Sequence, residues 1–331
     1  MRSLIRAVSL PLLLTPLLLF ELDARAGTPL HQIDSAPLRW TAIEVVTNDF
    51  NSVEKLRGLT GIKPGALLGI NDPRLKEACD AIRRQLPAKV VECAPVIGGK
   101  VTGYVEAEYI IEISARQPAL RPPPHCVPIA LAPDLAALSD EWGRVLTKTM
   151  ADGDADKERV NADQYLDYDS PLRHELTARI HGIVGARAGE LEQVSASCTA
   201  RSRAEAISLM SFTGSPARAI RLATARMSDP DPGVRNAATG LLGTFSDFIP
   251  SAAVAGIAKS ACATMISGGF NDRSKSLILL NRLRHRRLVT YHGLDAGCQD
   301  QIRAIARTSG AVQTGVPARE LVESAHPPPR T

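Results

Sequence analysis

The sequence feature that most constrains the fold is a nine-residue segment that recurs three times in the second half of the chain. The copies align without gaps and place their arginines at Arg203, Arg235 and Arg273, which are 32 and 38 residues apart. In each copy a small residue follows three positions after the arginine, and leucine and a second apolar residue follow at the sixth and seventh positions. A weaker copy starts at Leu172. Further amphipathic helices are predicted beside the copies, over about residues 187–198, 216–227, 251–266 and 294–308.

A pair of helices every 32 to 38 residues is typical of stacked helical repeats, because one pair cannot bury its apolar face alone. Stacking of neighbouring pairs makes a continuous core, so the sequence predicts an all-α part over residues 166–326. If the three arginines are equivalent, the leucines six positions later are equivalent core positions as well. Those leucines are Leu209, Leu241 and Leu279.

The stretch 229–238, which reads Asp-Pro-Asp-Pro-Gly-Val-Arg-Asn-Ala-Ala, is the most specific of these segments. Asp231 suits a helix N-cap, and Pro232 suits the first helical position. This stretch resembles the turn and second helix of HEAT repeats, including the bilin-lyase-like (PBS-lyase-like) subgroup. The resemblance implies a helical solenoid that recognises proteins. It also implies that the recurring Asp and Arg residues are structural and do not form a binding site.

Residues 38–115 have a different pattern, which reads in order as strand, helix, helix, strand and strand. β-branched residues over 39–47 predict the first strand. Ser52 can cap a short helix that ends at Gly61. The second helix is clearer, because Asp72 suits an N-cap and is followed by proline and then by an apolar stripe at helical spacing. The sequence therefore predicts an N-terminal α+β domain.

The last two strands of this domain are predicted to form a hairpin. Residues 89–96 read as a strand, and Gly98 and Gly99 read as the hairpin turn. Over residues 105–113 apolar residues alternate with glutamates, which is typical of a strand whose acidic face lies in solvent. The glutamates are Glu106, Glu108 and Glu112.

The order and spacing of these segments resemble a POTRA domain, the polypeptide-transport-associated module of bacterial envelopes. The resemblance rests on Ile43-Glu44-Val45, on the stretch 59–65, on the helix after Asp72 and on the hairpin that ends at 111–113. POTRA domains usually precede an outer-membrane β-barrel or follow a membrane helix, and the sequence predicts neither here. The resemblance therefore implies a soluble binding module and not a translocation pore. An unrelated small α+β sandwich is the alternative.

A sheet of this kind has an exposed edge, which we expect at Lys89 to Ala94. Edge strands carry unpaired N–H and C=O groups and can accept a partner strand by strand addition. Flanking charges can equally keep such an edge inert. The candidate binding residues are Lys89, Val90, Val91 and Glu92.

The first 26 residues are typical of a secretory signal peptide. Arg2 and Arg6 precede an apolar run over residues 7–20, and Ala24-Arg25-Ala26 forms a small-x-small cleavage pattern. An uncleaved membrane anchor is the alternative, but a spanning helix needs about 20 apolar residues, and this run has 14 residues, two of them proline. We therefore expect cleavage after Ala26 and a periplasmic protein with no membrane span. Secretion beyond the outer membrane is not excluded.

All six cysteines follow the signal peptide, and an even number in an exported protein favours disulfides. One pair can join the second helix of the N-terminal domain to the strand beneath it. Another can join equivalent helices of successive repeats, which stack side by side, and elimination gives the third. The expected pairs are Cys79–Cys93, Cys126–Cys198 and Cys262–Cys298.

Residues 116–165 connect the two parts of the chain. A run of prolines between 117 and 133 predicts a stiff connector, and a helix is expected over about residues 134–150. Acidic residues then follow at the spacing of a calcium loop, but the sharp-turn position is Lys157 instead of glycine and the last position is Asp163 instead of glutamate. We therefore expect a solvated loop and no metal site. The acidic residues are Asp152, Asp154, Asp156, Glu158 and Asp163.

No catalytic constellation is apparent in the sequence. His174 and His181 are seven residues apart, as are His285 and His292, but two imidazoles without an acidic or thiolate partner make a poor zinc site. The chain contains neither a Gly-x-Ser-x-Gly nor a His-Glu-x-x-His motif. The basic run over residues 282–287 can meet an acidic partner or complement the C-terminal end of a helix.

These observations predict an exported envelope protein that acts as a protein–protein interaction scaffold or adaptor, with no catalysis and no cofactor. The net charge of +4 gives no electrostatic reason to expect nucleic-acid binding. One alternative is a periplasmic chaperone that holds outer-membrane polypeptides by strand addition. A second is an enzyme related to the bilin-lyase-like HEAT proteins, against which export argues because that chemistry belongs to the cytosol.

Overall fold

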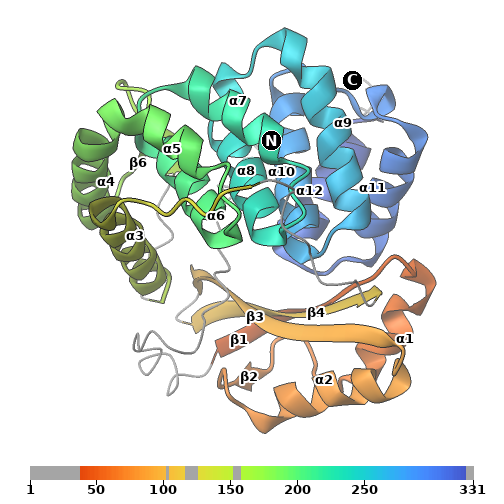
Figure 1. Cartoon of the computed structure of the whole chain (residues 1–331). Helices are drawn as coiled ribbons and strands as arrows, with labels where there is room; N and C mark the ends of the chain where they lie inside the picture. The colour runs from red at the N-terminus through yellow and green to blue at the C-terminus, as the bar shows by residue number, and fades with distance from the viewer. Residues whose placement is uncertain (1–37, 102–103, 116–125, 152–157, 326–331) are drawn as a thin grey trace, which may run out of the picture.

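A computed structural model of the chain describes residues 38–101, 104–115, 126–151 and 158–325 (Figure 1). The expected signal peptide with its cleavage site after Ala26, much of the proline-rich connector, and Asp152, Asp154 and Asp156 lie outside the described residues. The described part starts with a four-stranded sheet and continues as a succession of helices. The predicted class, an α+β start followed by a helical part, is therefore confirmed at this level.

The sheet has the strand order β2-β1-β4-β3, in which β1 is parallel to β4 and the other neighbours are antiparallel. The predicted order of strand, helix, helix, strand and strand is present, with the short β2 as an addition. Figure 1 shows α1 and α2 on one side of the sheet and the helical part of the chain on the other. The elements are β1 Leu38–Val46, α1 Val53–Leu59, β2 Leu67–Leu68, α2 Pro73–Gln85, β3 Lys89–Val101 and β4 Tyr104–Ala115.

Local sequence accounts for the helix boundaries in this domain. The side chain of Asp72 accepts a hydrogen bond from the backbone N–H of Arg74, and Pro73 opens α2, as expected. Gly61 lies just beyond α1 with φ of 64°, a conformation that glycine adopts without strain. Ser52 precedes α1, but its hydroxyl donates to the carbonyl of Asp49 and does not cap the helix.

The predicted turn at Gly98 and Gly99 is wrong. β3 runs through both glycines to Val101, so the hairpin turn comes after Val101. The register between β3 and β4 shifts between Ile97 and Lys100, where β3 has one residue more than its partner. Glycines are common at such a bulge because an extra residue needs unusual backbone angles.

The face of the sheet toward α1 and α2 carries the core of the N-terminal domain. Trp40 is completely buried, and its indole N–H donates to the carbonyl of Leu68 at 3.1 Å. The hydroxyl of Tyr109 donates to the carbonyl of Leu75 on α2 at 2.7 Å. These bonds satisfy the polar ends of two large aromatic side chains inside the core.

In the helical part, α6, α8, α10 and α12 lie next to one another in that order, while α7, α9 and α11 pack against α8, α10 and α12. The helices at 216–226 and 251–267 agree closely with the predicted ranges, whereas the short hairpin β5–β6 and the last helix α12 were not predicted. The elements are α3 Pro133–Ala151, β5 Glu158–Val160, β6 Leu166–Tyr168, α4 Pro171–Val184, α5 Ala188–Val194, α6 Ala200–Leu209, α7 Pro216–Arg226, α8 Pro232–Thr244, α9 Ser251–Ser267, α10 Phe270–His285, α11 Ala296–Thr308 and α12 Val312–Glu323.

The three aligned segments fall on α6, α8 and α10, which are successive neighbours. Their equivalent leucines are all buried, as predicted: Leu209 is 1%, Leu241 5% and Leu279 0% exposed. Asp231 accepts a hydrogen bond from the backbone N–H of Val234 and so caps α8. These helices therefore share one apolar core that continues from one pair to the next.

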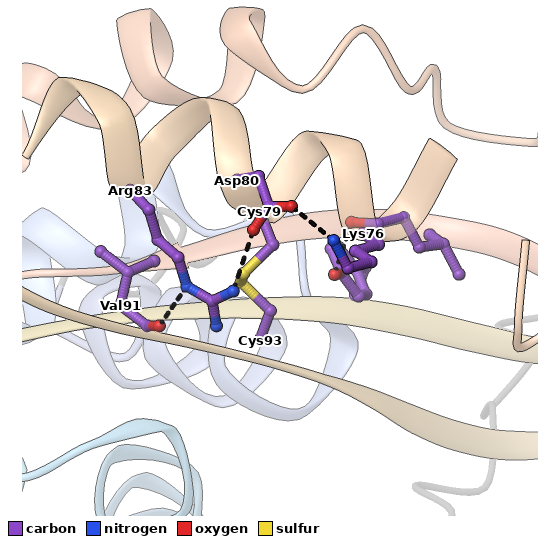
Figure 2. Close-up of a disulfide and its surroundings, with 8 residues drawn as sticks. Lys76, Cys79, Asp80, Arg83, Val91 and Cys93 are labelled. Atoms are coloured by element: carbon purple, nitrogen blue, oxygen red, sulfur yellow. Dashed lines mark hydrogen bonds and ion pairs between the residues drawn. A yellow bond between two sulfur atoms is a disulfide. The ribbon is translucent and has the colours of Figure 1, made fainter. Parts of the chain in front are cut away.

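Three disulfides are present, and they are the three predicted pairs. Cys79–Cys93 joins α2 to β3 (Figure 2). Cys262–Cys298 joins α9 to α11, which are neighbours as the stacking of equivalent helices requires. Cys126–Cys198 joins the segment before α3 to the residues that precede α6. Each cross-link is expected to reduce the number of conformations open to the unfolded chain and so to add about 2–4 kcal/mol of stability.

Candidate functional site

The predicted binding edge belongs to β3, which is an outer strand of the sheet. Lys89 and Glu92 are exposed, Val90 is half-buried, and Val91 is buried against the core of the N-terminal domain. The sequence therefore located an edge strand correctly. Whether that edge can accept another strand depends on its backbone groups.

Several backbone groups along this edge are already used. The guanidinium of Arg83 on α2 donates to the carbonyl of Val91 at 3.1 Å and also to Asp80 at 3.0 Å (Figure 2). The N–H of Lys89 donates to the carbonyl of Leu86. Pro95 is four residues beyond Val91, so it presents its backbone to the same side of the strand, and proline has no N–H. These features favour an edge that is kept inert.

A second group of charged residues lies where the sheet meets the helical part. Glu44 on β1 and Glu108 and Glu112 on β4 point from the face of the sheet opposite α1 and α2. The sequence predicted this acidic face to be in solvent, and that prediction is wrong for Glu108, which is only 6% exposed. Glu44 is buried to the same extent. The acidic face is covered because the ends of α10, α11 and α12 pack on it.

Two of these carboxylates bind the start of α12. One oxygen of Glu44 accepts hydrogen bonds from the backbone N–H groups of Gly310 at 3.1 Å and Ala311 at 3.4 Å. An oxygen of Glu108 accepts from the N–H of Val312, the first residue of α12, at 2.6 Å. The first N–H groups of a helix have no partner within the helix and carry partial positive charge. Glu108 satisfies the first of these groups, Glu44 binds the two residues just before the helix, and both carboxylates complement that charge.

The third carboxylate binds the start of α10 in the same way. Glu112 accepts a hydrogen bond from the N–H of Phe270, the first residue of α10, at 3.0 Å. Gly269 allows this approach, because a β-carbon at that position would overlap with the carboxylate of Glu112. The pair Gly268-Gly269 before an apolar helix was the sequence signal for this contact, and it was missed.

We call the contact of Glu44, Glu108 and Glu112 with the ends of α10, α11 and α12 the sheet–helix interface. Two arginines also take part in it. Arg57 on α1 donates to the carbonyl of Thr308 at 2.7 Å, so a positive charge lies at the C-terminal end of α11. Arg273 on α10 donates to the carbonyl of Thr47 at 3.0 Å and to the side chain of Asn48 at 2.7 Å. A small apolar cluster lies between these groups and consists of Val46, Val96, Ile110, Phe270 and Ala311.

Burial perturbs the charged groups of this interface. Loss of water raises the pKa of Glu108 to about 7, against an ordinary value of 4.5, and the N–H of Val312 opposes this rise only in part. Burial also raises the pKa of Glu44 and that of Glu112. It lowers the pKa of Arg273 to about 10. Within the described part of the chain, the second carboxylate oxygen of Glu108 and the Nε of Arg273 are buried without a hydrogen-bond partner.

The arginine series (Arg203, Arg235 and Arg273) connects the helices to this interface. Arg203 on α6 forms two hydrogen bonds with Asp229, at 2.9 and 2.7 Å, just before α8. Arg235 on α8 forms two with Asp272 on α10, at 3.0 and 2.7 Å. Arg273 continues the series by binding the end of β1. The resemblance predicted structural roles for these residues, and their contacts are structural.

The histidines and the basic run do not form a common site. His174 binds Asp167 at 2.8 Å, while His181 binds the carbonyl of Phe212 at 2.7 Å, so the structure gives the two imidazoles different partners. In the basic run, Arg282 donates to the carbonyl of Gly243, at the end of α8, and Arg286 donates to that of Ser246. These hydrogen bonds to backbone carbonyls favour a structural role for the basic run over binding of an acidic partner.

Among the residues that the structure describes, no three His, Cys, Asp or Glu side chains are arranged to hold a metal ion. Within the same ranges no helix has the length and apolar character needed to span a membrane. No protein-family model, curated protein or solved structure matches the chain. The resemblances to HEAT repeats and to POTRA domains therefore stay predictions.

Proposed function

We propose that this chain is an exported protein-binding scaffold in which a POTRA-like domain docks on a HEAT-like solenoid in one defined orientation. The observation that carries the proposal is the sheet–helix interface. Three carboxylates of the sheet bind backbone N–H groups at the starts of two helices, and Arg57 binds the last turn of a third. Such directed contacts hold the two parts in one orientation, which suits a partner that contacts both.

The packing of the helices supports the solenoid part of the proposal. Arg203 and Arg235 have the same pattern of contacts, since each also donates to the carbonyl six residues before it. α6 is thereby bonded to the turn just before α8, and α8 is bonded to α10. In a solenoid every repeat contacts its neighbours, and the extended surface that results is used to bind proteins. Catalysis is not part of this proposal.

The disulfides support export. Disulfides persist in oxidising compartments such as the periplasm and are rare in the cytosol. Here one disulfide lies in the N-terminal domain, one lies between helices, and one anchors the segment before α3. Together with the predicted signal peptide, they favour a periplasmic location.

Capture of partners from crosslinked envelope fractions tests the scaffold proposal. The tagged protein is compared with Glu112→Lys, which removes the bond to Phe270 and places a cation at the start of α10. Glu106→Lys is the matched control, because it makes the same charge change on the same strand. We expect one folded partner at a fixed stoichiometry, less of it with Glu112→Lys, and no loss with Glu106→Lys. Equal capture by all three proteins would contradict the proposal.

Strand addition by a chaperone is the alternative function, and Arg83 separates it from the scaffold. Arg83→Ala frees the carbonyl of Val91 on β3, whereas Arg84→Ala removes a neighbouring exposed arginine and serves as the control. If the protein is a scaffold, we expect Arg83→Ala to bind unfolded outer-membrane polypeptides no better than the unsubstituted protein does. An increase in their capture that is absent with Arg84→Ala would show that the β3 edge binds strands, and would favour the chaperone.

A further inference from the structure

The sheet–helix interface buries the carboxyl groups of Glu44 and Glu108 and half-buries that of Glu112. Glu108 is the most informative, because one oxygen accepts the N–H of Val312 while the other is buried without a partner within the described residues. An ionised carboxylate in this position therefore keeps an oxygen that is neither hydrated nor bonded. A protonated carboxyl keeps the bond to Val312 and removes the buried charge.

The surroundings of Glu108 add to this preference for the neutral form. The carboxylates of Glu44 on β1 and Glu106 on β4 repel a charge on Glu108, and Val96 on β3, its cross-strand partner, is apolar. The N–H of Val312 is the contact from α12 that favours the charged form.

The neighbouring carboxyls have their own charged neighbours. Arg57 and Arg273 favour the ionised forms of Glu44 and Glu112 respectively, whereas Glu92 and Asp272 disfavour ionisation of Glu112. Burial outweighs these cations, because the pKa values of both carboxyls are raised. All three glutamates of the interface therefore bind a proton more tightly when the sheet is docked.

We propose that the sheet–helix interface is a pH-sensitive switch that holds the sheet on α10 and α12 at acidic pH and loosens as the pH rises. This regulation concerns how the two parts of the chain are held together, whichever partner the scaffold binds.

The sign of the effect follows from linkage. The docked state has the raised pKa, so it binds protons that the separated state releases, and docking is strongest below the ordinary pKa of 4.5. Docking weakens as the pH rises through about 7. For Glu108 alone, a two-state linkage between these values predicts a docking constant roughly 30-fold smaller at pH 8 than at pH 5.5. Glu44 and Glu112 act in the same direction.

Hydrogen exchange of the Val312 amide measures this docking constant, because that N–H is bonded to Glu108 and to no residue of its own helix. Exchange is followed on the full chain at pH 5.5 and pH 8 and corrected for the intrinsic effect of pH. We expect protection to fall by at least about 30-fold between the two, because Glu44 and Glu112 add to the effect of Glu108, while amides inside α7 keep their protection. Protection that is unchanged or higher at pH 8 would overturn the proposal.

Two substitutions assign the effect to Glu108. Glu108→Gln is a neutral mimic of the protonated carboxyl and is expected to reduce the fall in protection between the two pH values, leaving only the part due to Glu44 and Glu112. Glu106→Gln is the matched control: it removes only the weakest of the effects that raise the pKa of Glu108, so it is expected to keep most of the dependence of the wild type. A dependence that persists unchanged in Glu108→Gln would show that another group is responsible and would refute the assignment.

A further variant keeps the test decisive if Glu108→Gln does not fold. Val312→Pro removes the N–H that favours the ionised form, and proline is well tolerated at the first position of a helix. The preceding residue, Ala311, has φ of −71° and ψ of 136°, which suits a residue before proline. With the Phe270 amide as the reporter, the loss of protection between pH 5.5 and pH 8 is expected to exceed that of the wild type. A smaller or equal loss would contradict the switch.

Discussion

Substitution of Gly269 by alanine tests how tightly the sheet is bound to the helices. The residue has φ of −80°, which any amino acid adopts, so the change introduces no backbone strain. The added methyl group would overlap with the carboxylate of Glu112, which must swing away from α10. Its hydrogen bond to the N–H of Phe270, 3.0 Å long, is then lost. A hydrogen bond to a charged group contributes about 1.5–3 kcal/mol, and we expect a loss of that size.

Urea unfolding of the purified protein, combined with hydrogen exchange, measures this loss. Gly256→Ala is the control, because a β-carbon there meets no atom within 4 Å and Gly256 lies inside α9. It is expected to stabilise the protein by about 0.5–1 kcal/mol, since alanine favours helix over glycine. We expect Gly269→Ala to lower the free energy of unfolding and to expose the Phe270 amide. If Gly269→Ala stabilises the protein as Gly256→Ala does, Glu112 does not bind α10 as described.

Three further predictions concern the core, the processing and the disulfides. Leu241→Ala should lower the free energy of unfolding by about 2–5 kcal/mol, as other buried leucine truncations do. Hydrogen exchange should show loss of amide protection in the neighbouring helices first, while residues 105–113 keep their protection. A uniform loss of protection would instead mean that the whole chain unfolds as one cooperative unit. The intact mass of the exported protein should lack the residues up to Ala26, and retention of those residues with the membrane would contradict export. Peptide mapping without reduction should recover Cys262 linked to Cys298. Free thiols at these two positions would show that α9 and α11 are not neighbours.

The elements that the sequence predicted well are those with local causes. α2 and α8 each have an aspartate cap followed by proline, and both helices begin where these residues predict. Two of the disulfide pairs followed from the predicted faces of helices and strands, because a cysteine on an inward face can reach only its near neighbours, and the third pair followed by elimination. α12 was missed because Pro317 lies inside it, and proline normally ends a helix.

The candidate site was harder to predict, because its partners are far apart and lack a side-chain signature. Glu108 lies 204 residues before Val312, and Glu112 lies 158 residues before Phe270. In both pairs the donor is a backbone N–H, which every residue except proline carries. Alternation of glutamate with apolar residues therefore has the same appearance whether the acidic face meets water or the ends of helices.

The central claim is that carboxylates of the sheet bind the first N–H groups of α10 and α12. Hydrogen exchange of the Phe270 and Val312 amides at acidic pH tests it most directly, because the first N–H groups of a helix have no partner within that helix. Ala296 is the internal reference: it begins α11, a helix whose other end, at Thr308, is the one bound to the N-terminal domain, through Arg57 of α1. We predict strong protection at Phe270 and Val312 and rapid exchange at Ala296. Equally rapid exchange at all three positions would contradict the account.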